Sequence, residues 1–345
     1  MSISTPASLE MRNAVLPFLE ELRKKDAFQK VIVGVSGGGD SLALAATLFR
    51  NRGTLEIIPV VVDHGLQKNS AEIAEKAKQE LIKIGFDNIF MGKAQVELID
   101  GLEASARRAR YKVFEQAMEN FGSQTFFLAH TKNDQAETVL LGLMRGSGSR
   151  SLEGMRPRNG VYLRPLLEIE RATTEQCCIE QGIEFWQDPH NFDERFMRVR
   201  VREKLLPAMV EELGVGVVSG LAQSAAQFQR DNDFFAIEVG KLIEKINGFH
   251  SREENFSTNA DSQELKKWSC QREILRDSHP AIRTRALREI MISVGVKAEQ
   301  LNYDHFEALE KLILSSKPLG PVYLPGGIWA RVDGTNFLLE GSDRQ

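Results

Sequence analysis

The hexapeptide SGGGDS at 36–41 joins the apolar run VIVGV at 31–35 to a segment with helical periodicity. Three adjacent glycines let the main chain approach a ligand closely, and free N–H groups at a helix N-terminus bind anions. A lysine phosphate loop would carry lysine where this chain has Asp40, and a carboxylate instead suits a magnesium ion that bridges phosphate oxygens. The alternative is a tight turn in which Asp40 only caps the helix. The stretch predicts a phosphate cradle, with a metal at Asp40, that consists of Ser36, Gly37, Gly38, Gly39, Asp40 and Ser41.

Asp63 and His64 end a second apolar run, LEIIPVVVD at 55–63. A run that is apolar throughout is typical of a strand buried on both faces of a parallel sheet. Because open parallel sheets bind ligands at the carboxyl ends of their strands, we predict that these two residues lie near a bound nucleoside. A polar turn without a ligand is the alternative.

A histidine and two acids follow another apolar run, TFFLAH at 125–130. His130, Asp134 and Glu137 are spaced i, i+4 and i+7, which places them on one side of a helix start. Carboxylates there suit magnesium, with Asp134 as the second metal residue, or the ammonium groups of a substrate. A zinc site would require more histidine or cysteine ligands and is not predicted. A capped helix with surface acids is the alternative.

The segment 103–121 has a helical pattern whose buried face is defined by the apolar residues of its second half. On a helical wheel Arg110 falls inside this face and Arg107 lies at its edge, whereas Arg108 points away. A buried arginine needs an anionic partner. We predict that Arg107 and Arg110 hold a phosphate or the substrate, and a structural carboxylate such as Glu103 is the alternative partner.

The segment ERFMRVRVREK at 194–204 is strongly basic, although the whole chain has a net charge of −4. Arg198 and Arg202 share a helical face, and we predict that they meet a phosphate of ATP or of a nucleic acid. The alternative is a solvated face that pairs with Glu194 and Glu203.

The elements that must position these residues alternate along the chain. Short apolar runs and helical segments take turns up to about residue 210, which is typical of a doubly wound α/β fold with a mostly parallel sheet. Helical stretches alone follow, and the run VYLPGGIWARVDGTNFLLE at 322–340 has a hairpin signal at Asp333–Gly334. We predict a catalytic domain at 1–212, a smaller helical domain at 213–316 and a short β-hairpin tail at 317–345.

The composition of the 345 residues sets outer limits. A net charge of −4 does not favour a protein that coats nucleic acid unselectively. Three cysteines without a CxxC pair argue against a disulfide framework, and neither a signal peptide nor a membrane-length apolar run is present. We therefore predict a cytoplasmic protein without a membrane partner. The oligomeric state stays open, with a homodimer as one option.

The stretch SGGGDS resembles the SGGxDS signature of the PP-loop ATP pyrophosphatases. Four further stretches, in the same order along the chain, are similar to the tRNA(Ile)-lysidine synthase family. They are VDHGLQKNSAEIA at 62–74, GLEASARRARY at 101–111, AHTKNDQAETVLLGLMRGSG at 129–148 and DPHNFDERFMRVRVREKLLPAM at 188–209. With RPLLEIER at 164–171 the resemblance spans residues 30–210.

This resemblance implies a ligase that uses ATP and magnesium to join free L-lysine to C2 of the wobble cytidine of a tRNA(Ile) with a CAU anticodon. AMP and pyrophosphate would leave, and the helical domain would position the tRNA. Two departures stand out: Asn133 replaces an aspartate, and Val199 replaces an asparagine. An aspartate that only capped the helix could be replaced by asparagine without loss. The implied catalytic residues are Asp40, Asp134, Glu137, His130, Arg107, Arg110, Arg198 and Arg202.

Two rival functions follow from the same residues. Another PP-loop enzyme, which adenylates a different tRNA base or a small substrate, would bind ATP but ignore lysine. A catalytically decayed tRNA-binding protein would not turn over ATP. The intact Ser36, Asp40, Ser41, Asp134 and Glu137 argue against decay.

Overall fold

The computed structural model describes residues 5–26, 28–63, 65, 70–97, 102–146, 148–186, 193–250 and 268–341. The chain divides into two compact units, Met1–Gln229 and Arg230–Gln345. The division falls within the long helix α10 (Gly216–His250). Each unit has its own sheet and its own apolar core.

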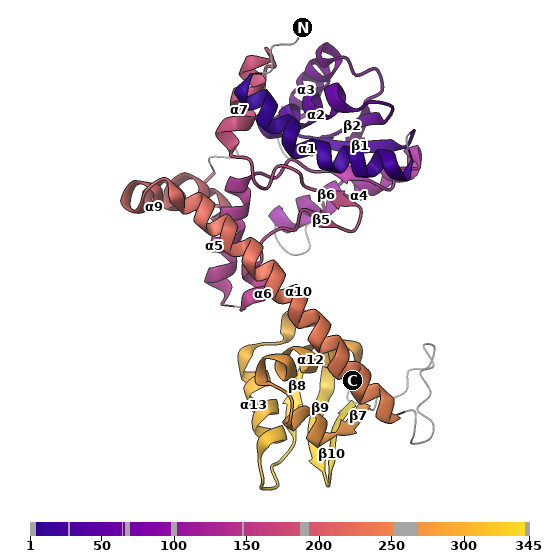
Figure 1. Cartoon of the computed structure of the whole chain (residues 1–345), viewed down its shortest axis with the longest axis vertical. Coiled ribbons are helices and arrows are strands. Elements are labelled where there is room, and N and C mark those ends of the chain that lie inside the picture. The colour runs from indigo at the N-terminus through magenta and orange to yellow at the C-terminus, as the bar shows by residue number, and fades with distance from the viewer. Residues whose placement is uncertain are drawn as a thin grey trace. The chain divides into compact units, whose positions relative to one another are not determined.

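The first unit contains a six-stranded sheet in the order β3-β2-β1-β4-β6-β5. Figure 1 labels four of its strands, β1, β2, β5 and β6. All neighbours pair in parallel except β5 and β6, which are antiparallel. This arrangement confirms the predicted mostly parallel sheet. The strands are β1 (Lys30–Val35), β2 (Glu56–Asp63), β3 (Phe90–Lys93), β4 (Phe126–Phe127), β5 (Arg158–Asn159) and β6 (Tyr162–Leu163).

Helices connect and cover these strands, and the basic segment near residue 200 includes a turn of π-helix, η2. The helices of this unit, besides the start of α10, are α1 (Pro6–Lys25), α2 (Gly39–Asn51), α3 (Ser70–Ile84), α4 (Leu102–Phe121), α5 (Lys132–Arg145), α6 (Ser149–Leu152), α7 (Arg171–Glu180), α8 (Met197–Arg200), η2 (Val201–Leu205) and α9 (Leu206–Leu213).

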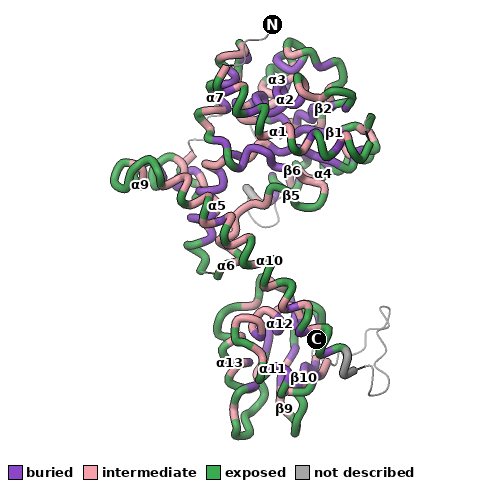
Figure 2. The backbone as a smooth tube through the Cα atoms, viewed as in Figure 1, coloured by how far each residue is buried: buried purple, intermediate pink, exposed green. Residues whose placement is uncertain are grey.

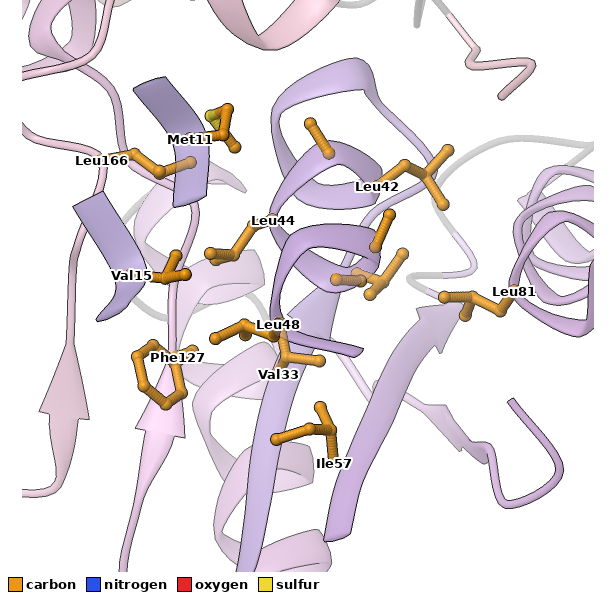
Figure 3. Packing of buried hydrophobic residues seen from close by; sticks show 14 of the residues in the cluster. Met11, Val15, Val33, Leu42, Leu44, Leu48, Ile57, Leu81, Phe127 and Leu166 are labelled. Carbon is orange, nitrogen blue, oxygen red and sulfur yellow. The ribbon is translucent and has the colours of Figure 1, made fainter. Parts of the chain in front are cut away.

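Alternate residues of β1 enter two different cores. Val31, Val33 and Val35 belong to the core that α1, α2 and α3 cover, whereas Ile32 belongs to the core under α4. This follows from the period of two in a strand, and it means that helices cover both faces of the sheet. Figure 3 shows Val33 among side chains of the first core, and Figure 2 shows how buried residues gather in β1, β2 and α2.

The strand order reverses between β1 and β4, because β2 and β3 lie on one side of β1 and β4 lies on the other. The carboxyl ends of β1 and β4 therefore open a crevice, which is where sheets of this kind bind ligands. The loop 36–38 leaves β1 at this edge, and His130 follows β4 at the same edge.

The second unit is not purely helical. Its four-stranded antiparallel sheet has the order β7-β10-β9-β8 and packs on its helices. The elements are β7 (Trp268–Gln271), α11 (Arg272–Arg276), α12 (Pro280–Ser293), η3 (Ala298–Gln300), α13 (Tyr303–Leu314), β8 (Val322–Leu324), η4 (Pro325–Gly327), β9 (Ile328–Asp333) and β10 (Asn336–Gly341).

The hairpin predicted at Asp333–Gly334 is present, with Asp333 opposite Asn336 and Gly334 at φ +58°. The predicted separate tail is wrong, because Phe337 and Leu339 of this hairpin are fully buried against Leu287 and Leu309 of the helices. The prediction missed β7, a four-residue strand that adds to the hairpin through Cys270 opposite Phe337.

Among the described residues no single helix is long and apolar enough to cross a membrane. One pair of helices, Met197–Leu213 and Gly216–Asn247, meets the length and composition together, across a bend of 106°.

Candidate active site

The loop between β1 and α2 is closed by its two serines. Ser41 Oγ accepts from the Ser36 N–H at 3.1 Å and donates to the Gly38 carbonyl at 2.9 Å. Gly38 is the N-cap of α2, and no side chain caps it. Asp40 is the second residue of the helix, so the alternative in which it caps α2 is wrong. The first N–H groups of α2 therefore begin at the glycines, as an anion cradle requires.

The three glycines have different reasons to be small. Gly37 adopts φ +85°, which favours glycine, and its carbonyl accepts from the Trp186 N–H at 2.9 Å. A Cβ on Gly39 would meet the Phe185 ring at 3.3 Å. A Cβ on Gly38 would meet no protein atom closer than Ser36 Oγ at 3.6 Å. The protein itself does not exclude a side chain at Gly38, so its small size fits close approach of a ligand.

Asp134 and Glu137 lie near the start of α5 and are buried, with Glu137 fully so. Asp134 Oδ2 accepts from the Thr131 N–H at 2.8 Å and from the Thr131 hydroxyl at 2.9 Å, which completes a capping box. This capping fixes one oxygen of Asp134 and turns Oδ1 toward the basic side chains.

Two of the predicted arginines converge on these acids. Arg198 Nε donates to Glu137 Oε2 at 2.7 Å, and Arg202 Nε donates to Glu137 Oε1 at 2.6 Å. Their Nη2 atoms lie 3.4 Å and 3.1 Å from Asp134 Oδ1. The alternative partner Glu194 pairs instead with Lys204 of the same segment, at 2.5 Å.

A third arginine, which the sequence prediction did not single out, completes the cluster. Arg171 begins α7, and its guanidinium contacts Asp40 Oδ2 at 3.2 Å, Asp134 Oδ1 at 3.1 Å and Glu137 Oε1 at 3.7 Å. Thr174, one turn later, donates to Asp40 Oδ1. Arg171 thus links the phosphate loop to the acids of α5. Arg171 is the last residue of RPLLEIER, a stretch that resembles the tRNA(Ile)-lysidine synthase family, so the sequence did contain a signal for this residue.

Asn133 explains how Arg171 is placed. Its Oδ1 accepts from the Arg171 N–H at 3.0 Å, which satisfies the first free donor of α7. The prediction that residue 133 caps its own helix is wrong, because the N-cap of α5 is Thr131 and Asn133 lies inside the first turn. Aspartate and asparagine both supply an acceptor here. The other departure, Val199, is buried and packs as an apolar side chain.

The cluster contains three acids and three arginines, so its charges balance. The pKa values of the titratable groups at the site are shifted in different directions. Burial would raise the pKa of Asp134, but Arg171 and Arg198 outweigh it and hold this pKa well below its usual range. Burial raises the pKa of Asp40, and Arg171 opposes that shift. Burial lowers the pKa of His130 to about 4, so its imidazole is neutral at neutral pH.

The other predicted residues are placed differently. Arg110 is exposed, against the wheel prediction, because Ala106, Ala109 and Val113 form the buried stripe at this end of α4. Arg107 is also exposed, and its Nη2 donates to the Tyr111 hydroxyl at 3.2 Å.

Asp63 ends β2 as predicted, and its Oδ1 accepts from the Gly65 N–H at 2.9 Å. His64 lies outside the described residues, and so does the side chain of Glu103.

The carboxylates of Asp40 and Asp134 suit a hard cation, because both present oxygen to one guanidinium, that of Arg171. Among the described residues no three side chains of histidine, cysteine, aspartate or glutamate form a metal site. Magnesium in proteins is held by one or two carboxylates together with substrate phosphates and water. The two carboxylates therefore fit magnesium that arrives with a nucleotide, provided that Arg171 yields its place between them.

Comparison with known proteins places this arrangement in a family. A PP-loop domain model matches residues 11–209. The tRNA(Ile)-lysidine synthase of Leifsonia xyli is 39% identical over 315 residues, 90% of this chain and 88% of the relative. That of Thermobifida fusca is 38% identical over 328 residues, 94% of this chain and 95% of the relative.

A solved structure, the U34-tRNA thiolase NcsA from Methanococcus maripaludis with its [4Fe-4S] cluster, aligns with 62% of this chain and 79% of that chain. It does so at 15% identity and a TM-score of 0.48, a likeness too distant to bear on function. Because the two synthases match this chain over most of their own length and of this chain, the chain belongs to the tRNA(Ile)-lysidine synthase family of PP-loop proteins.

Proposed function

We propose that the protein is an ATP-dependent ligase that converts the wobble cytidine of a tRNA(Ile) with a CAU anticodon into lysidine. In the first step O2 of the cytidine attacks the α-phosphate of ATP, an O–P bond forms and pyrophosphate leaves. In the second step the ε-amine of free L-lysine attacks C2, a C–N bond forms and AMP leaves with the former O2. The names of the relatives and the PP-loop match support this reaction.

One arrangement carries the proposal. Arg171 contacts Asp40 beside the phosphate loop and also Asp134 and Glu137 at the start of α5. A loop that holds a departing pyrophosphate is thereby joined to a buried acid pair that can receive an ammonium group. Both partial reactions need these two functions within one crevice.

The loop residues bind the phosphates. The N–H groups of Gly39 and Asp40 belong to the first turn of α2, where the helix dipole favours negative charge. Ser36 is exposed, and its hydroxyl, which lies 3.2 Å from Ser41 Oγ, can turn to a phosphate. In the first step Asp40 and Asp134 would hold magnesium, which would supply positive charge to the leaving pyrophosphate. We assign Asp63 and His64 to binding of the nucleoside.

In the second step, Asp134 and Glu137 bind the lysine substrate through its ammonium charge. Asp134 stays ionised because three guanidinium groups face its Oδ1 atom. It therefore acts as a charge partner and not as a proton acceptor. Arg198 and Arg202 keep both carboxylates in place, and we assign His130 and Arg107 to the phosphate at which bonds change. The helical part of the second unit positions the tRNA, and a homodimer remains one form in which the enzyme could act.

The reaction predicts which products depend on which substrates. Purified protein with ATP, magnesium, lysine and an unmodified tRNA(Ile) transcript should release AMP and pyrophosphate, and omission of lysine should reduce the steady yield. AMP formation that ignores lysine would indicate a PP-loop enzyme with another substrate. No cleavage of ATP with any tRNA, by protein that still binds tRNA, would indicate a decayed enzyme.

A further inference from the structure

Arg164 is a buried cation that the described residues leave without a counter-charge. It follows β6 directly, and only 6% of its surface is exposed. Its Nη1 donates to the Arg156 carbonyl at 3.2 Å, and it also interacts with the Tyr111 hydroxyl. Its Nε is buried without a hydrogen-bond partner, and no described acid forms an ion pair with it. Buried charges in proteins are normally paired, so this one points to a missing anion.

The neighbours of Arg164 are cationic or neutral. His130 lies close enough to Arg164 and Arg107 for both to lower the pKa of its ring, and its Nδ1 is also buried without a partner. Arg107 shares the Tyr111 hydroxyl with Arg164. Two guanidinium groups, a phenol and an imidazole therefore face one another with two unused polar atoms.

Asp134, the acid beside His130, cannot serve as the counter-charge. Asp134 Oδ1 already faces Arg171, Arg198 and Arg202, and its Oδ2 accepts from Thr131. The acid–arginine cluster is thus neutral in itself, and the positive charge of Arg164 lies outside it. The cluster is neutral and the group around Arg164 is positive, although both lie at the crevice of the sheet.

The position in the sheet supports a ligand and not a structural anion. Leu128 N–H donates to the Leu163 carbonyl at 2.8 Å, so β4 and β6 run side by side up to His130 and Arg164. Both side chains thus stand at the carboxyl ends of neighbouring parallel strands, next to the point where the strand order reverses. Tyr111 and Tyr162, with ring centroids 5.1 Å apart, both lie beside Arg164.

We propose that Arg164, with Arg107, His130 and Tyr111, forms an anion subsite that takes one phosphate group. Guanidinium forks match phosphate oxygens, and burial makes each such hydrogen bond strong. The phosphate belongs either to the nucleotide or to the RNA backbone beside the reacting base. Only the choice of these two phosphate sources rests on the proposed function. The subsite itself lies apart from the acid pair Asp134 and Glu137.

Equilibrium binding tests the subsite without turnover. Affinities of the full-length protein for ATP alone, and for an anticodon stem-loop RNA alone, are measured for the wild type and for Arg164→Met. We expect the variant to bind one of the two ligands about tenfold more weakly or worse, because charge-assisted hydrogen bonds to a buried phosphate are lost. The ligand that loses affinity identifies the source of the phosphate.

The matched control is Arg158→Met, on the same hairpin. Arg158 is exposed and pairs with Glu21 at 2.8 Å, so both affinities should stay within about twofold of the wild type. Equal losses in the two variants, unchanged affinities in Arg164→Met, or a loss confined to free lysine would each overturn the subsite.

The melting temperature separates a binding role from a structural one. Removal of an unpaired buried charge should leave the melting temperature of Arg164→Met unchanged or raise it, whereas loss of a structural arginine would lower it. Should Arg164→Met fail to fold, the structural role wins unless Arg164→Lys folds and shows the same selective loss, since lysine keeps the charge but lacks the Nε donor. These measurements need no lysine transfer, so they stand even if the proposed reaction is wrong.

Discussion

Both units bury an arginine, and they satisfy it in opposite ways. Arg283 in the second unit is 3% exposed, and each of its guanidinium nitrogens has a partner. Its Nε and Nη2 contact Glu310 at 3.1 Å and 3.0 Å, and its Nη1 donates to three backbone carbonyls. Arg164 in the first unit is buried almost as fully but keeps a free Nε and has no described acid. A closed arrangement of this kind stabilises a fold, whereas an open one leaves room for a ligand.

The acid–arginine cluster of the first unit shows the same openness in another form. Three guanidinium groups share Asp134 Oδ1, which is more than one oxygen needs, and Arg171 bridges two carboxylates that would suit a metal. Such a cluster can exchange one cation for another at little change in net charge. We therefore expect substitutions in the first unit to affect activity more than stability, and those at Arg283 to do the reverse.

The largest effect is expected at the phosphate loop. Asp40→Ala removes a carboxylate from the loop and leaves Arg171 with two other acids. AMP formation should fall by about a thousandfold or more, because an interaction with the leaving pyrophosphate is lost, while the melting temperature stays close to that of the wild type. Wild-type AMP yield from this variant would refute the role of Asp40.

The matching change in the second unit should destabilise the protein. Arg283→Met leaves Glu310 and three carbonyls without their donor, and we expect a loss of about 3 kcal/mol in the free energy of unfolding of this unit. Urea denaturation with a probe in the second unit measures it. Two results would contradict a purely structural role of Arg283. One is an unchanged free energy of unfolding, and the other is loss of AMP formation in a variant that is still folded.

The pH dependence of stability sharpens the contrast further. Burial lowers the pKa of His130 from 6.5 to about 4, so the folded protein binds this proton later than the unfolded chain does. The associated stability is present above pH 6.5 and is lost as the pH falls toward 4. His130→Asn should remove roughly 2 kcal/mol of that loss, the ring being partly exposed. Identical stability profiles for the two proteins would contradict the shift.

The smallest effect is expected at Asn133. Asn133→Ala deletes the acceptor of the Arg171 N–H and should lower the free energy of unfolding by about 1 kcal/mol. Asn133→Asp keeps an acceptor and should stay within about 0.5 kcal/mol of the wild type, with AMP formation preserved. If the aspartate variant instead gained activity severalfold, residue 133 would act on the metal and not as a cap.

Local signals predicted the parts of the site that are local in the chain. The phosphate loop, the acids at 134 and 137 and the arginine pair at 198 and 202 follow from glycine spacing and helical periodicity, and the structure brings them together. The partners of these residues could not be predicted in the same way. Arg198 meets Glu137 across 61 positions of sequence, and Arg171 meets Asp40 across 131.

The errors also have physical reasons. The wheel for α4 took its buried face from large apolar residues, but small Ala106 and Ala109 set the contact with the sheet, so Arg110 turns outward. Strand β7 has only four residues and gains its stability from pairing with β10, which follows it by more than 60 residues in sequence. No local pattern marks such a strand.

Transfer of lysine to RNA tests the central claim most directly. Labelled L-lysine is incubated with the protein, ATP, magnesium and an unmodified tRNA(Ile) transcript with a CAU anticodon, beside a methionine tRNA with the same anticodon. We predict ATP-dependent incorporation into the isoleucine tRNA only, at the wobble cytidine. Absence of label from both tRNAs, while ATP is still cleaved to AMP and pyrophosphate, would contradict the assignment of lysine and retain only the PP-loop chemistry.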